Sequence, residues 1–223
     1  MYKEDGKTTF DTAVFDLDGT LLDTLEDLAG SVNHVMRTLG YPEKTLDEVR
    51  RSVGNGGAKL MERVLPGGRE DPAYERAVQM HTEYYEAHCR IRTRPYDGVM
   101  EALEQLKEAG VKMAIVSNKG DGAVKVLARE FFGDLIPIAV GEREGIRRKP
   151  APDTVEEAIR QLGSAKEHTI YVGDSEVDDQ TARNAGIPCI LVAWGFRGRQ
   201  ELEKQVHPAH LIDAASELPA FFF

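Results

Sequence analysis

The sequence has few of the residues that mark secreted, disulfide-stabilised domains. It contains two cysteines, Cys89 and Cys189, and neither has a cysteine or histidine neighbour at metal-ligand spacing. No structural disulfide is therefore expected, and a reducing cytoplasm is the predicted compartment. No apolar run reaches the roughly 20 residues needed to cross a bilayer. Met1–Thr12 is polar and charged, so we do not expect a secretory signal there.

Positive charge is also scarce. The 28 Lys and Arg residues are outnumbered by 38 Asp and Glu residues, which gives a net charge of −10. Nucleic-acid binding needs a basic surface, so a nucleic-acid partner is not expected, and neither is a membrane. A small anionic substrate stays compatible with this balance, because a metal ion and a few local cations reverse the field inside a cleft.

Short β-branched and apolar runs alternate with helical patterns along most of the 223 residues. Several of these runs are almost continuously hydrophobic, as expected for strands that are covered on both faces. Alternation of this kind predicts an α/β fold, a Rossmann-like core built on a parallel sheet. The predicted strands are Thr12–Leu17, Lys112–Ser117, Ile136–Val140, Thr169–Gly173, Cys189–Trp194 and His210–Ile212, and the predicted helices between them are Gly98–Ala109, Asp121–Glu130, Asp153–Leu162 and Asp178–Ala185.

One stretch breaks this alternation. About 65 residues after the first strand carry helical patterns and no strand pattern, far more than a direct crossover between adjacent strands requires. We therefore expect an inserted all-helical cap domain over residues 23–90, with residues 1–22 and 91–223 forming the core. The predicted cap helices are Thr24–Leu39, Leu46–Ser52, Ala58–Leu65 and Asp71–His88.

The first strand ends in an unusual pair of carboxylates. Asp16 directly follows the apolar run Ala13–Phe15, Asp18 comes after one more apolar residue, Leu17, and Gly19 and Thr20 come next. An unpaired carboxylate is costly to bury, so a divalent metal ion is the simplest partner for the pair. An ordinary Asp-Gly turn is the structural alternative.

Polar residues end the other strands as well. Ser117 and Asn118 follow the second strand and Asp174 follows the fourth, with Asp178 and Asp179 soon after. Ligands of parallel α/β sheets bind beyond the carboxyl ends of the strands, so we expect these groups to converge on one edge. The cationic loop Arg147–Pro150 precedes the helix that leads into the fourth strand.

This set of motifs resembles the haloacid dehalogenase superfamily of phosphotransferases almost from end to end. The matching motifs are Asp16-x-Asp18-Gly19-Thr20, Ser117-Asn118, Lys149-Pro150 and Gly173-Asp174-Ser175-x-x-Asp178. The helical insert is similar to the cap of that family. Phe15–Thr24 and the loop Val53–Gly57 are most similar to its phosphoglycolate phosphatase-like branch.

The resemblance implies a phosphatase that acts on a small phosphate ester, with 2-phosphoglycolate as the leading candidate. Asp16 would be the nucleophile that forms an aspartyl-phosphate, and Asp18 the general acid and then the general base. Lys149 would offset the charge of the phosphoryl group and the nucleophile. Ser117, the Asn118 backbone N–H and Gly19 would hold the phosphate oxygens.

The implied cofactor is Mg²⁺. Asp16, Asp174 and the main-chain carbonyl of Asp18 would bind it, and Asp178 would act through water or orient Lys149. Asp179 has similar spacing but fits a solvated charge at a helix start. Arg147 and Arg148 are more typical of solvated surface than of ligands, and the loop Gly54–Gly57 is compatible with an anion site or with a plain loop.

Two other functions remain open at this point. A phosphomutase of the β-phosphoglucomutase type would use Asp16 and Asp18 but return the phosphoryl group to a sugar. A phospho-aspartate signalling module also places acidic residues and a lysine at the edge of a parallel sheet, although it does not need the long insert. The sequence leaves the oligomeric state and the role of Phe221–Phe223 unknown.

Overall fold

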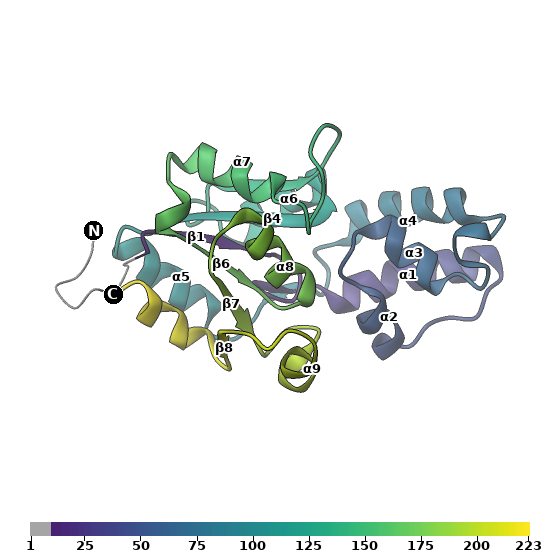
Figure 1. Cartoon of the computed structure of the whole chain (residues 1–223). Coiled ribbons are helices and arrows are strands. Elements are labelled where there is room, and N and C mark those ends of the chain that lie inside the picture. Colours follow the sequence, from purple (N-terminus) through teal and green to yellow (C-terminus); the bar gives the residue numbers. More distant parts are fainter. Residues whose placement is uncertain (1–9) are drawn as a thin grey trace.

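The computed structural model describes residues 10–223, which form a six-stranded parallel sheet and an all-helical insertion (Figure 1). The strand order is β5-β4-β1-β6-β7-β8, and every neighbouring pair is parallel. This confirms the predicted Rossmann-like α/β core with a helical cap. The strands are β1 (Thr12–Phe15), β4 (Lys112–Gly120), β5 (Ile138–Glu142), β6 (Thr169–Gly173), β7 (Cys189–Val192) and β8 (His210–Ile212).

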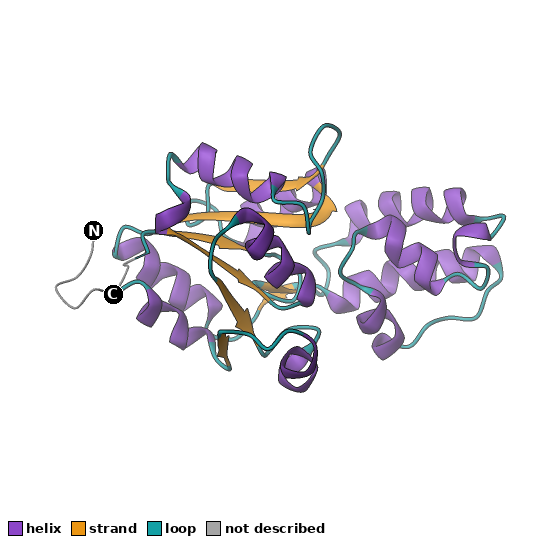
Figure 2. Ribbon diagram, in the orientation of Figure 1, coloured by secondary structure: helices purple, strands orange, loops and turns teal. Residues whose placement is uncertain are grey.

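Helices cover both faces of the sheet (Figure 2). Successive residues of a strand point to opposite faces, so Ala13 and Phe15 of β1 pack in one apolar cluster and Val14 packs in another. The first cluster includes residues of α5 and α6, and the second includes residues of α7 and α8. These helices are α5 (Val99–Glu108), α6 (Asp121–Phe131), α7 (Asp153–Leu162) and α8 (Glu176–Ala185).

Several predicted strand ends were wrong. β1 ends at Phe15, before the turn in which Leu21 and Leu22 donate to the Leu17 carbonyl. β4 continues beyond Ser117, because Gly120 pairs with Glu142 after a register shift. Ser117 and Asn118 therefore lie inside an extended strand.

The later edge of the sheet also differs from the prediction. β5 is displaced by two residues from the predicted strand, and β7 stops before Trp194, whose indole donates instead to the Thr20 carbonyl. Helix α9 (Gly198–Gln205) was not predicted, because only Leu202 in this polar segment is buried. Near the C-terminus, Phe222 packs in the core while Phe223 is exposed.

The cap contains four α-helices and one short 3-10 helix, Gly68–Glu70. It lies to one side of the sheet in Figure 1. Two short segments lead into and out of the cap and pair as an antiparallel ribbon, β2 (Leu22–Asp23) and β3 (Arg94–Pro95). Next to this ribbon, the buried Asp27 carboxylate accepts hydrogen bonds from the backbone of Arg92 and Thr93. The cap helices are α1 (Leu25–Leu39), α2 (Leu46–Ser52), α3 (Gly57–Val64) and α4 (Tyr74–His88).

The assignment of residues 23–90 to a separate domain stays a prediction. Within the described part of the chain, no helix combines the length and apolar character that a membrane span requires.

Candidate active site

The predicted site residues meet at the carboxyl edge of the sheet. Asp16 follows β1, Ser117 and Asn118 lie near the end of β4, Asp174 follows β6, and Lys149 comes from the loop before α7. All five line one cavity of about 340 Å³, and residues of the cap line its other side. The topology therefore brings together side chains from four distant parts of the chain.

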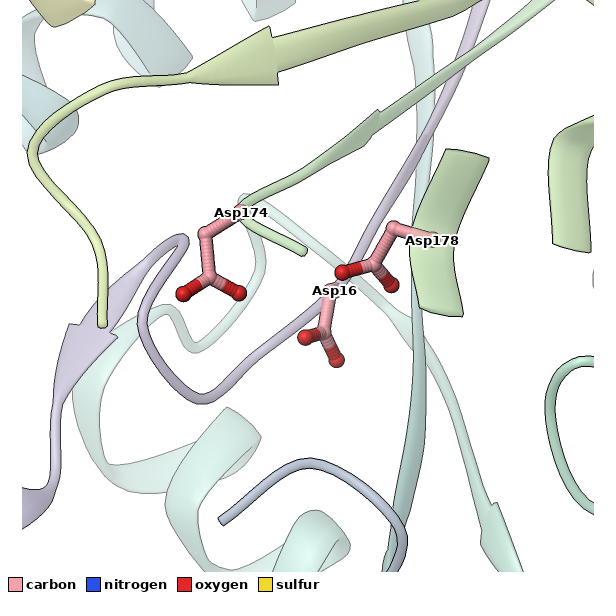
Figure 3. A group of neighbouring side chains, drawn as sticks. All are labelled: Asp16, Asp174 and Asp178. Atoms are coloured by element: carbon pink, nitrogen blue, oxygen red, sulfur yellow. The ribbon is translucent and has the colours of Figure 1, made fainter. Parts of the chain in front are cut away.

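Three buried carboxylates form the centre of this edge. Figure 3 shows Asp16, Asp174 and Asp178 beside one another, and one oxygen from each lies within 4.8 Å of the others. Burial raises the pKa of Asp16 to about 7, and the ammonium of Lys149 offsets only part of this effect. Burial and the charges of Asp178 and Asp16 also raise the pKa of Asp174 well above its usual range. The cluster therefore needs a further positive charge.

Lys149 supplies one positive charge. Its Nζ lies 2.8 Å from Asp16 Oδ1 and 2.8 Å from Asp178 Oδ1, and it donates to the Tyr171 hydroxyl at 3.0 Å. Burial alone would lower the pKa of Lys149, but the two carboxylates outweigh it and hold that pKa above its usual range. Lys149 is therefore a protonated cation inside the cluster.

Asp178 lies behind Lys149. Its Oδ1 accepts from Lys149 and Tyr171, and its Oδ2 accepts from the backbone N–H and hydroxyl of Ser175 in the capping box that begins α8. Both oxygens are thus engaged, which fits the expected role of orienting Lys149. Asp179 points elsewhere and pairs with Arg183 one turn along the helix.

The remaining carboxylate oxygens suit a divalent cation. Asp16 Oδ2 and Asp174 Oδ1 accept no hydrogen bond from residues 10–223, whereas Asp174 Oδ2 accepts from the Phe196 N–H at 2.7 Å. A Cβ at Gly19 or Gly195 would overlap the Asp174 carboxylate, so both glycines leave room for it. Several carboxylate oxygens that point to one place, and that together carry more negative charge than the neighbouring lysine offsets, are typical of a divalent metal site. Asp16 and Asp174 would hold the ion.

Asp18 does not belong to the group of three carboxylates, but its charge acts on Asp16. Its Oδ1 accepts from the Thr24 hydroxyl at 2.6 Å and lies 2.9 Å from Lys119 Nζ. The Ser117 hydroxyl lies 3.5 Å from Asp18 Oδ2. Asp18 is thus placed where the cap meets the core, and its side chain lines the cavity.

Asn118 has a second role that the sequence did not indicate. Its side-chain amide accepts from the Lys149 N–H at 2.7 Å and donates to the Lys149 carbonyl at 3.0 Å. The amide thereby holds the loop that presents Lys149. The predicted contact of the Asn118 backbone N–H with phosphate stays a prediction.

The two arginines beside Lys149 are exposed. Arg147 pairs with Asp153, and Arg148 lies 3.7 Å from Glu142. In the cap loop, Gly54 and Gly56 line the cavity and Gly57 begins α3.

Sequence reasoning missed two cations of the cavity. Lys119 is almost fully buried between Asp18 and Tyr85 of the cap, and Arg197 joins Glu176 to the Val53 carbonyl of the cap loop. The position of Lys119 directly after Ser117-Asn118 was the only local signal for it. No pattern in the sequence marked Arg197.

Comparison with known families agrees with this geometry. The model of the haloacid dehalogenase-like hydrolase family matches residues 13–192, which include every predicted site residue. The chain belongs to this family. A Thiobacillus denitrificans protein named phosphoglycolate phosphatase is 36% identical over 196 residues, covering 85% of this chain and 86% of that protein. A Rhodobacter capsulatus protein of the same name is 36% identical over 204 residues, covering 90% of this chain and 91% of that protein.

Solved structures show the same architecture. A Lactobacillus delbrueckii subsp. bulgaricus protein, provisionally named a phosphoglycolate phosphatase, superposes with a TM-score of 0.90 at 33% identity. The match covers 96% of this hydrolase and 99% of that chain. CbbY from Rhodobacter sphaeroides, solved with phosphate, has a TM-score of 0.78 at 26% identity, covering 94% of this chain and 96% of that one.

This haloacid dehalogenase-like hydrolase also buries a histidine in the cap wall of the cavity. His81 Nδ1 lies 2.8 Å from the Ser31 hydroxyl, and burial together with the charge of Lys119 lowers the pKa of His81 to about 4. The ring is therefore neutral in the folded protein at neutral pH. An unfolded chain binds this proton near pH 6.5, so acidification below that pH favours unfolding until the folded ring also protonates.

We expect the protonation of His81 in the unfolded chain to lower the free energy of unfolding by about 2 kcal/mol when the pH falls from 7.5 to 5. Urea unfolding at both pH values gives the change in unfolding free energy for the wild type and for His81→Gln. The difference between these two changes is the contribution of His81. His168→Gln, which changes a partly exposed histidine outside the cap, is the matched control. Equal pH dependences for wild type and His81→Gln would contradict the prediction.

Proposed function

We propose that this protein is a Mg²⁺-dependent phosphatase that hydrolyses a small phosphorylated metabolite, with 2-phosphoglycolate as the leading substrate. The observation that carries the proposal is Asp16, a buried carboxylate with one unengaged oxygen beside Asp174 and a protonated lysine. The names of the relatives at 36% identity support the choice of substrate. We also propose that residues 23–90 form a cap domain on a core made of 1–22 and 91–223.

The first chemical step makes and breaks one bond to phosphorus. An Asp16 oxygen forms a bond to phosphorus as the bond from phosphorus to the ester oxygen breaks, and Asp18 gives its proton to the departing alcohol. Lys149 neutralises charge beside Asp16 at 2.8 Å. Bound Mg²⁺, held by Asp16, Asp174 and the Asp18 carbonyl, would neutralise charge on the phosphate oxygens.

The second step regenerates the enzyme. Asp18 takes a proton from water, the water oxygen bonds to phosphorus, and the bond between phosphorus and the Asp16 oxygen breaks to release inorganic phosphate. The Ser117 hydroxyl, the Asn118 N–H and the open backbone at Gly19 are the proposed contacts for the remaining phosphate oxygens. The Lys149 backbone is anchored to Asn118, so the ammonium keeps its place through both steps.

Metal removal is the direct test of cofactor and reaction. We expect phosphate release from 2-phosphoglycolate to fall at least about 10²-fold after EDTA treatment and gel filtration, because the acidic cluster loses its main compensating charge. Added Mg²⁺ should restore the rate. Full activity of the metal-free protein would contradict the proposal.

The same assay separates hydrolase from mutase. A metabolite panel that includes sugar 1-phosphates should yield free phosphate, with 2-phosphoglycolate among the best substrates. Conversion of a sugar 1-phosphate to its 6-phosphate without phosphate release would favour the mutase instead.

A further inference from the structure

The cavity has two chemically different ends. The phosphate end holds the carboxylates of Asp16 and Asp174, Ser117 and Lys149. The cap contributes mainly apolar side chains and the rings of Tyr85 and His81, together with Thr82 and one acidic residue, Glu86. A phosphate ester bound at Asp16 must therefore direct its organic group towards the cap. Whatever charge that group carries has to be balanced at this second end.

Among residues 10–223 three cations line the cavity, and the contacts of two of them lie away from Asp18. Lys149 is shared among Asp16, Asp178 and Tyr171. The Arg197 guanidinium is bound by Glu176 and the Val53 carbonyl at the edge of the cap.

Lys119 is the third cation, and it lies between the two ends. Its Nζ is 2.9 Å from Asp18 Oδ1, donates to the Tyr85 hydroxyl at 2.6 Å and lies 4.0 Å from the centre of the Tyr85 ring. The side chain is 7% exposed. An ammonium has three donors, and the third has no partner among residues 10–223. A buried ammonium beside apolar walls attracts an anion far more strongly than one in water.

We infer that Lys119 recognises a carboxylate on the carbon next to the ester oxygen, and so determines specificity for phosphorylated 2-hydroxy acids. This inference rests on the proposed function, in which Asp18 protonates the ester oxygen. The atoms attached to that oxygen then lie beside Asp18, and Lys119 is the cation in contact with Asp18. A substrate carboxylate at this place pairs with Lys119, whereas an uncharged alkyl group leaves the ammonium desolvated without a new partner.

Tyr85 makes this recognition depend on the cap. It belongs to α4, while Lys119 belongs to β4 of the core, and their contact joins the two across the cavity. The Tyr85 hydroxyl therefore orients the ammonium towards the space where the substrate carboxylate lies. Tyr85 acts as a positioning residue, because it works through Lys119.

The test compares 2-phosphoglycolate with ethyl phosphate, in which a methyl group replaces the carboxylate. The measured quantity is the ratio of their kcat/KM values, so any general damage to Asp18 cancels. We expect Lys119→Met to lower this ratio about 10²-fold, because it removes the partner of a buried charge. Lys119→Arg should keep part of the preference and Tyr85→Phe should lower it about tenfold. Lys125→Met, which changes an exposed lysine of α6, should leave the ratio unchanged.

Binding gives a readout that does not depend on turnover. Calorimetric titration of Asp16→Asn with Mg²⁺ and 2-phosphoglycolate should show an affinity that falls when Lys119→Met is added. Titration with ethyl phosphate should show a much smaller loss. If Lys119→Met does not fold, Tyr85→Phe and Lys119→Arg provide the same comparisons.

The outcomes separate this inference from the proposed function. A wild type that prefers 2-phosphoglycolate, with variants that keep the full preference, would overturn the role of Lys119 and leave the phosphatase intact. A wild type with Mg²⁺-dependent activity but no preference for the carboxylate would also overturn it. A wild type that releases no phosphate from any ester would overturn the proposed function itself.

Discussion

Asp16→Asn should lower kcat on 2-phosphoglycolate at least about 10³-fold, the scale expected for loss of an essential nucleophile. Asparagine has nearly the shape of aspartate, but its amide oxygen is neutral and a poor nucleophile. The fold should remain intact, because burial, together with the charges of Asp178 and Asp18, already raises the pKa of Asp16 to about 7. Steady-state phosphate release measures the loss, and circular dichroism checks the fold.

Acid quenching adds a direct view of the intermediate. Wild-type protein mixed with ³²P-labelled substrate and quenched within one turnover should carry label on Asp16, and Asp16→Asn should carry none. Asp179→Asn is the matched control, because Asp179 pairs with Arg183 outside the cluster. Activity of Asp16→Asn close to that of the control would remove Asp16 from the mechanism.

Lys149→Met should affect both activity and stability. Methionine fills much of the same volume but leaves Asp16 and Asp178 without the cation that lies 2.8 Å from each. Breaking a buried ion pair by removing one partner costs about 3–5 kcal/mol, and we expect a loss of that size in unfolding free energy without metal. We also expect kcat/KM to fall at least about 10³-fold, because charge at phosphorus and at the nucleophile is no longer offset.

Urea unfolding and steady-state kinetics measure these two effects. Lys166→Met provides the comparison, because Lys166 forms an exposed pair with Glu156, and such pairs contribute about 0–1 kcal/mol. Near-normal kinetics for Lys149→Met would mean that the loop before α7 does not reach the phosphoryl group. Normal stability together with lost activity would show that the pair acts in catalysis without stabilising the fold.

Local patterns were sufficient for much of the fold. Short apolar and β-branched runs predicted all six strands of the sheet, and the central ones are almost continuously apolar because they are buried on both faces. The ribbon β2–β3 was missed, since two-residue strands have no measurable period. Helix α9 was missed because it buries a single side chain, Leu202. Strand ends were inaccurate where pairing with a neighbour, as at Gly120, decided how far the strand extends.

By itself the sequence determined that Asp16, Asp174 and Lys149 reach the carboxyl edge, because each lies just after a strand or before a helix of recognisable pattern. Only the tertiary structure decided what these residues touch. Asn118 holds the Lys149 backbone, and Lys119 joins Asp18 to Tyr85 of the cap. These contacts link residues 31, 101 and 34 positions apart, and no local period encodes them. The first two exist because β1, β4 and the loop before α7 meet at one edge of the sheet, and the third because α4 of the cap packs against that edge. Both arrangements are properties of the whole fold.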